Sequence, residues 1–204
     1  FPTRRSSDLR PSEISSWNVG WLEAHESFVY ETFLYTIASL CKTQSYRTLH
    51  TILVGNYLLP AHSGNNQFGK FDEFYAYSEV INPAIATGNQ KYTSPAMELI
   101  KRSADRRDLT FDSLKEADIL SLVVSLVKNI HWYPQTHYYW EHGRIAPFFL
   151  RAAQHKNFAK LATITGIPTG DKLRELIVKQ IAELQTNGRR RISFDGALNL
   201  EALD

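Results

Sequence analysis

The segment from Ile130 to Arg144 concentrates the side chains that could do chemistry. It holds three of the seven histidines, two of the tryptophans and three of the tyrosines. Within it, His137, Glu141 and His142 form H-x-x-x-E-H, one residue longer than the zinc-binding pattern H-x-x-E-H. On a helix five residues advance by about 500°, so the two histidines would project roughly 140° apart and could not chelate one ion. We therefore predict no metal site and no cofactor.

The aromatic side chains of the same segment favour a binding function more than a metal centre. Trp132, Tyr138, Tyr139 and Trp140, beside Arg144, would form a stacking platform for single-stranded nucleic acid, because bases stack on aromatic rings. Packing of these rings inside the domain is the competing interpretation. The 23 Lys+Arg against 21 Asp+Glu leave a net charge of only +2, which does not support a polyanionic partner.

Arg151 and His155 lie four residues apart and would be neighbours on the surface of a helix. The pair is similar to the R-x(4–6)-H motif of the HEPN ribonucleases, although three residues intervene here and Ala152 follows the arginine. The resemblance implies an all-helical domain and metal-free RNA cleavage. In that chemistry the arginine stabilises phosphate charge, and the histidine acts as general acid or base. An ordinary charged helix surface explains the same two residues, so the ribonuclease is an alternative function.

The elements that must position these residues are predicted to be helices. Apolar residues recur at spacings of three, four and seven along most of the chain. The expected helices cover residues 21–42, 46–59, 71–81, 94–104, 113–130, 147–166 and 171–185. The third is ambiguous, because its aromatic content also favours a strand. The apolar side of the first is expected to consist of Leu22, Phe28, Tyr35, Ile37 and Leu40.

The ends of two helices carry recognisable signals. Ser113 and Glu116 match the capping box S-x-x-E, in which each side chain satisfies a free backbone N–H at a helix start. The helix from Ser113 to Ile130 is almost continuously apolar after Ile119, so we expect it to be central and covered on most sides. Gly166 stands at the end of the helix expected at 147–166, in the position where a glycine adopts positive φ with little strain.

The predicted fold class is mostly α, a bundle-like domain of about six helices. At most one or two short strands are expected, near residues 136–140 and 191–195. A hydrophobic content of 43% with 12% aromatic residues is typical of a globular domain. The lone Cys41 excludes an internal disulfide framework and any CxxC motif.

The first nine residues are predicted not to belong to the natural protein. The sequence from Phe1 to Leu9 matches one reading frame of a common sequencing adapter at every position, so we interpret residues 1–9 as a translation artefact. Residues 10–204 are then expected to form a single helical domain, with the loop at 83–93 as the place where it would divide. This domain is expected to be the C-terminal part of a longer protein.

The preferred function is that of a non-catalytic accessory or regulatory domain of a larger prokaryotic protein. Its expected partner is an upstream domain of the same chain or another protein. No membrane association is expected, because the apolar run from Ile119 to Val127 is about half of the ~18 residues that suggest a span. Cysteine usage fits a reducing compartment, so a cytoplasmic location is expected.

Overall fold

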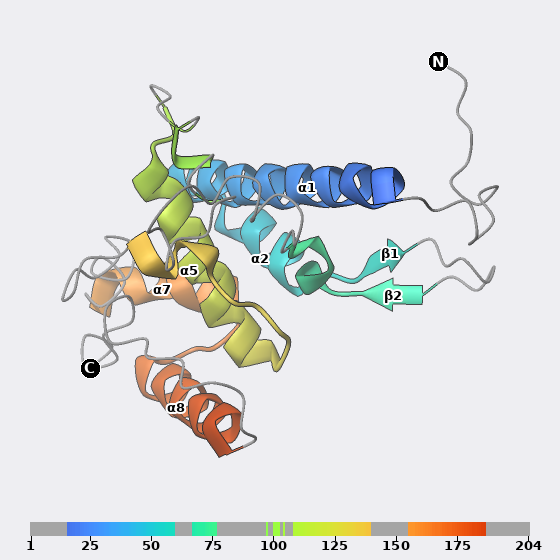
Figure 1. The fold of residues 1–204 in the computed structure, drawn as a ribbon. Coiled ribbons are helices and arrows are strands. Elements are labelled where there is room, and N and C mark those ends of the chain that lie inside the picture. Colours follow the sequence, from blue (N-terminus) through green and yellow to red (C-terminus); the bar gives the residue numbers. More distant parts are fainter. Residues whose placement is uncertain are drawn as a thin grey trace.

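The computed structural model describes residues 16–59, 67–76, 97, 100–102, 104, 108–139 and 155–186. Its elements, in chain order, are α1 (Ser16–Lys42), α2 (Tyr46–Val54), β1 (Tyr57–Leu59), β2 (Gln67–Gly69), the 3-10 helix η3 (Phe71–Phe74), α5 (Phe111–Lys128), the 3-10 helix η4 (Gln135–Tyr139), α7 (His155–Thr165) and α8 (Gly170–Thr186). Residues 97 and 100–102 are also helical. The mostly α prediction is confirmed, with one small antiparallel sheet among the described residues (Figure 1).

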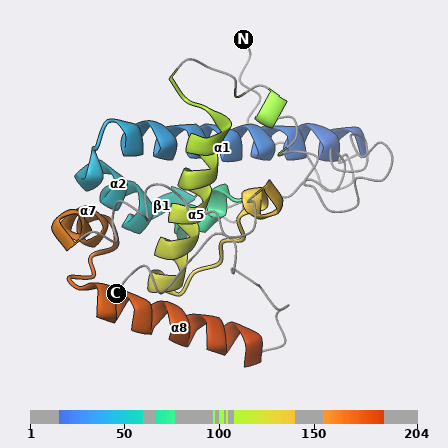
Figure 2. The same ribbon diagram turned by 90° about the vertical axis from the view of Figure 1, so that its left-hand side faces the viewer.

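Helix α5 is the central element of the described structure. It runs from α1 at one end to α8 at the other, with α2 and α7 along one side (Figure 2). From Leu114 to Leu126 nearly every side chain is buried. The prediction of a central helix covered on most sides is confirmed, and its cause is the apolar sequence beyond Ile119.

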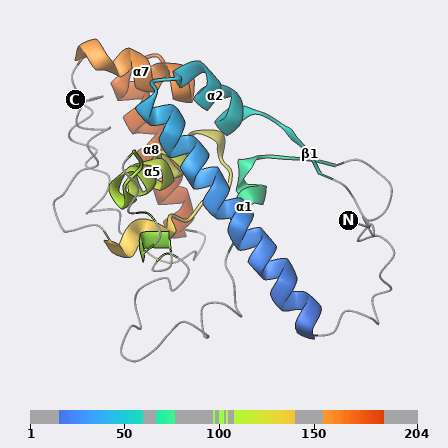
Figure 3. The ribbon, with the colours of Figure 1, turned by 90° about the horizontal axis from the view of Figure 1, so that it is seen from above.

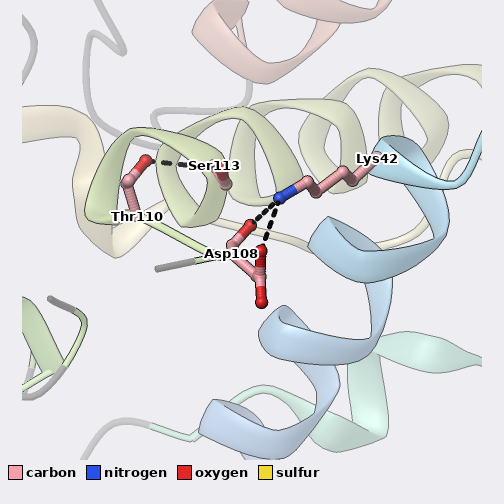
Figure 4. Close-up of polar contacts among 4 residues, drawn as sticks. All are labelled: Lys42, Asp108, Thr110 and Ser113. Atoms are coloured by element: carbon pink, nitrogen blue, oxygen red, sulfur yellow. Dashed lines mark hydrogen bonds and ion pairs between the residues drawn. The ribbon is translucent and has the colours of Figure 1, made fainter. Parts of the chain in front are cut away.

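The predicted capping box does not form at the start of α5. The N-cap is Thr110, and it makes no side-chain capping bond. Ser113 lies in the first turn of the helix, with its Oγ 3.4 Å from Thr110 Oγ1 (Figure 4). The segment leading into α5 is held by Lys42, whose Nζ donates to the Asp108 carbonyl and lies 3.6 Å from Asp108 Oδ1. This contact links the last residue of α1 to the segment that leads into α5.

The second helix is shorter than its apolar spacing predicts. It ends at Val54 because Gly55 and Asn56 are poor helix formers, and the chain then enters β1. The Tyr57 hydroxyl donates to the Ile52 carbonyl, and its ring packs edge-on against Phe74 at 4.6 Å. The hairpin of β1 and β2 was not predicted, since residues 57–59 read as helix and 67–69 as loop.

Two other predictions of secondary structure are wrong in the described residues. Residues 71–74 form a 3-10 helix and Tyr75 is extended, so no α-helix runs through this part of 71–81. Residues 135–139 form a 3-10 helix in place of the short strand expected near 136–140. A backbone bond from the Thr136 N–H to Asp118 Oδ2 favours this turn over strand pairing. The strand expected at 191–195 lies outside the described residues.

The last two helices complete the described core. Helix α7 begins at His155 in the structure, and residues 147–154 of the expected helix lie outside the described part. Gly166 has a φ of 76°, as predicted for a residue that follows a helix in the left-handed region. His50 Nδ1 lies 2.9 Å from the Ile164 carbonyl and ties α2 to the end of α7. Helix α8 packs against α5 through the buried Leu173 and Ile177.

Candidate functional site

The residues predicted for ribonuclease chemistry lie outside the described side chains. Arg151 is not described, and of His155 the structure describes only its place as the first residue of α7. The metal-free ribonuclease therefore stays a prediction. Among the described residues, no group of three or more His, Cys, Asp or Glu could hold a metal ion.

One residue of the predicted stacking platform, Trp132, is buried in the core. Trp132 is only 3% exposed, and its ring contacts those of Tyr30, Phe33, Phe71 and Tyr75 at centroid distances of 5.3 to 5.7 Å. A ring enclosed in this way has no free face on which a base could stack.

The other members are described only in part. Tyr139 is half-buried, with its ring edge-on to Phe111 at 5.3 Å and Lys101 Nζ 5.3 Å from its centroid. The side chain of Tyr138, as well as Trp140 and Arg144, lies outside the described part. For these residues nucleic-acid binding stays a prediction.

A buried polar cluster, which the sequence analysis missed, centres on Asp118 of α5. Its side chain is fully buried, and the indole N–H of Trp132 donates to Oδ1 at 2.8 Å. The backbone N–H of Thr136 donates to Oδ2 at 2.9 Å, and the Tyr30 hydroxyl lies 3.5 Å from Oδ1. The carboxyl group thus joins α5 to α1 and to the segment 131–139.

Burial raises the pKa of Asp118 from 3.8 to about 6. The hydrogen bonds from Thr136, Trp132 and Tyr30 lower it, but by less than burial raises it. The Thr136 hydroxyl oxygen is buried and has no hydrogen-bond partner of standard geometry. Its proximity to the Asp118 carboxyl group nevertheless lowers the pKa of Asp118. Burial, followed by the nearby charge of Asp118, also raises the pKa of Tyr30 well above its ordinary value.

The second feature is the N-terminal half of α1, which projects from the rest of the molecule (Figures 1 and 3). Between residues 21 and 29 no side chain is buried, and Tyr30 is the first buried residue in the part of α1, from Trp21 onward, whose side chains the structure describes. Trp21 is 71% exposed, Leu22 59% and Phe28 66%. The prediction that Leu22 and Phe28 belong to a side of the helix that packs within the domain is therefore wrong.

The apolar face of α1 changes sides along its length. Trp21 and Tyr30 are nine residues apart, as are Phe28 and Ile37, and nine residues correspond to about two and a half turns. Each exposed aromatic residue therefore lies on the side of the helix opposite to its buried counterpart. Packing within the described domain explains Tyr30 and Ile37 but not Trp21 and Phe28.

Trp21, His25 and Phe28 follow one another at i, i+4 and i+7, and all three are exposed. We call this row the α1 stripe. Residues 16–41 contain Glu23, Glu26 and Glu31 and no lysine or arginine, so this part of the helix carries a charge of −3 while the whole chain carries +2. The α1 stripe therefore lies on an acidic helix in a slightly basic protein.

The hairpin adds two more exposed apolar side chains. Leu58 and Phe68 are directly opposite each other in the antiparallel register and are 58% and 68% exposed. Opposite residues in such a pair point to the same face of the sheet. The hairpin and the projecting half of α1 extend from the same side of the molecule, away from α7 and α8 (Figure 3).

A comparison of this chain with protein-family models, with curated proteins and with solved structures finds no match. Among the described helices, none combines the length and the apolar character that crossing a membrane would require.

Proposed function

We propose that this chain is a non-catalytic accessory domain that binds a separate protein through the α1 stripe. The observation that carries the proposal is the change of apolar face along α1, which turns Trp21 and Phe28 away from the core. A helix that presents anchors at i, i+4 and i+7 is suited to lie in an apolar groove of another protein. Tryptophan is among the residues that most often dominate binding energy at such interfaces.

The charge of α1 indicates the chemistry of the partner. The sequence of residues 16–41 has a net charge of −3, and this negative charge favours a groove bordered by basic residues, because complementary potentials favour encounter and correct register. The same negative charge disfavours pairing of two copies of α1, since that arrangement would bring like charges together. The proposed partner is therefore a protein with an apolar groove and a basic rim.

A crosslinking experiment tests this function. A photoreactive phenylalanine derivative replaces Trp21 or Phe28 in the full-length protein, which is expressed in cells of the organism that encodes it. The control position is Lys172, which is exposed on α8, away from the projecting half of α1. We expect an adduct with one other protein from positions 21 and 28 and none from 172.

Calorimetry with the purified partner then measures the contribution of the stripe. Substituting both Trp21→Ala and Phe28→Ala is expected to weaken binding by about tenfold or more, while Lys172→Ala leaves it unchanged. Binding should also weaken as the salt concentration rises. Equal affinity of all three proteins, or adducts that join two copies of this chain, would contradict the proposal.

A further inference from the structure

We propose that Asp118 acts as a latch controlled by its own protonation. The latch holds the segment 131–139 on α5 and on the middle of α1, at Tyr30, and sets how readily that segment opens. This inference is independent of the function proposed for the α1 stripe. It is carried by the geometry of four buried groups: the Asp118 carboxyl group, the Tyr30 hydroxyl, the Trp132 indole, and Thr136 with its backbone N–H and its hydroxyl.

The two shortest contacts require each oxygen of the Asp118 carboxyl group to accept a hydrogen bond. Trp132 Nε1 and the Thr136 backbone N are both obligatory donors, and they point to Oδ1 and Oδ2 respectively. A carboxylate accepts both bonds fully, whereas a neutral acid has one oxygen that carries the proton and accepts poorly. These two bonds are therefore stronger when Asp118 is ionised, and they oppose the effect of burial on the carboxyl group without outweighing it.

The remaining two polar groups allow the cluster to hold either state. The hydroxyls of Tyr30 and Thr136 are both buried, and a hydroxyl can donate to a carboxylate or accept from a neutral acid. The Tyr30 hydroxyl is 3.5 Å from Oδ1. The Thr136 hydroxyl oxygen is buried and has no hydrogen-bond partner of standard geometry. The Tyr30 hydroxyl can thus serve either state of Asp118, and the Thr136 hydroxyl is a second group close to the carboxyl that could do the same.

Among the residues that the structure describes, no cation neutralises the carboxylate. Lys115, one turn earlier on α5, has its Nζ 2.6 Å from Asp112 Oδ1. The other titratable groups around the cluster are Tyr30 of α1 and Tyr75 of the extended segment after η3, and His131 is exposed. No charged side chain that the structure describes in α2, α7 or α8, which also pack on α5, contributes to the pKa shift of Asp118.

The sign of the effect follows from burial, which is the largest cause of the shift. In the closed structure the pKa of Asp118 is about 6, and in an open segment exposed to water it would return toward 3.8. The closed form therefore binds the proton more tightly, so a low pH favours closure. As the pH rises through 6, the buried negative charge favours opening.

Native-state hydrogen exchange of the full chain, followed by mass spectrometry, tests the latch. Exchange rates of peptides covering 131–139 are corrected for the intrinsic dependence on pH. With pKa values of about 6 closed and 3.8 open, the opening constant should rise about tenfold between pH 5 and pH 7.5. Peptides from α2 and α7 serve as the internal control, and their opening should not show this rise.

The variant Asp118→Asn keeps the shape of the side chain and removes its titration, so opening of 131–139 should lose its dependence on pH. If this variant does not fold, the carbon-13 shift of the Asp118 carboxyl group in the unaltered protein gives the same information. A titration midpoint near 6 supports the latch, and a midpoint near 4 overturns it. An opening constant that does not change with pH in the unaltered protein, or that changes equally in Asp118→Asn, would also overturn it.

Discussion

The indole N–H of Trp132 donates to Oδ1 of Asp118 over 2.8 Å, and this bond ties the chain that leaves α5 back to the middle of the same helix. Both residues are buried, and the Trp132 ring is stacked on Tyr30 of α1 with centroids 5.7 Å apart. One hydrogen bond therefore lies at the meeting point of three segments. Its removal should affect both the stability of the fold and the protonation of the carboxyl group.

Trp132→Phe tests this bond, because it keeps a ring in place and removes the donor. We expect the free energy of unfolding to fall by at least about 2 kcal/mol, since a hydrogen bond to a charged group and some buried area are lost. The pKa of Asp118 should rise, because a bond that lowers it is gone. Urea unfolding and carboxyl carbon-13 titration measure the two effects. Trp21→Phe, at a position 71% exposed, is the matched control and should change stability by less than about 0.5 kcal/mol.

Asp118 should also leave a signature in the dependence of global stability on pH. Its pKa is raised in the folded state, so its stabilising contribution is complete below pH 3.8 and is lost as the pH rises through 6. A shift from 3.8 to about 6 corresponds to about 3 kcal/mol. Urea unfolding of the unaltered protein and of Asp118→Asn at several pH values isolates this contribution. From pH 4 to pH 8, the free energy of unfolding of the variant should rise by about that amount relative to that of the unaltered protein. If the free energies of the two proteins depend on pH in the same way, the assignment is refuted.

The two sides of α1 can be compared with one chemical change. Phe33 is 7% exposed and Phe28 is 66% exposed. Phe33→Ala should lower the free energy of unfolding by about 3 to 5 kcal/mol, because it empties a packed site among aromatic rings. Phe28→Ala should change it by less than about 0.5 kcal/mol. Denaturant unfolding of both variants distinguishes them, and a large loss in Phe28→Ala would mean that this ring packs within the domain.

Gly166→Ala tests the connection between α7 and α8. The φ of 76° is strained for any residue with a Cβ, so the substitution should destabilise the protein by about 1 kcal/mol. The added Cβ would lie 3.7 Å from His50 Cε1, an ordinary contact, so the backbone is the expected source of the loss. Thermal unfolding measures the change. Gly166→Asn is the matched variant and should be less destabilising, because asparagine tolerates this conformation better.

The sequence predicted most of the helices because their apolar periodicity is a local property. The burial of α5 follows directly from its continuous apolar run after Ile119, and the end of α7 from Gly166. The second helix was predicted too long because the spacing from Leu53 to Tyr57 fits a helix, although Gly55 and Asn56 interrupt it. The hairpin depends on pairing between residues eight to twelve apart, which no local pattern encodes.

The candidate sites were harder to predict, since they depend on contacts between distant segments. A signal for the buried cluster does exist, because Asp118 is the last charged residue before a nine-residue apolar run. A carboxylate at such a place must find buried donors. That Trp132 and Thr136 supply them could not be known without the fold. The reversal of the apolar face on α1 was readable from the nine-residue spacings, but the side that packs inside is decided by tertiary structure.

The attachment of the projecting half of α1 has a consequence for the kinetics and thermodynamics of recognition. An isolated peptide of this length would be largely unfolded in water, because helix nucleation is unfavourable. Here the nucleus already exists, since the helix continues without a break into turns anchored by Tyr30 and Ile37. The aromatic side chains are thus presented on a preorganised scaffold, and association would not need to supply the conformational entropy of folding a peptide.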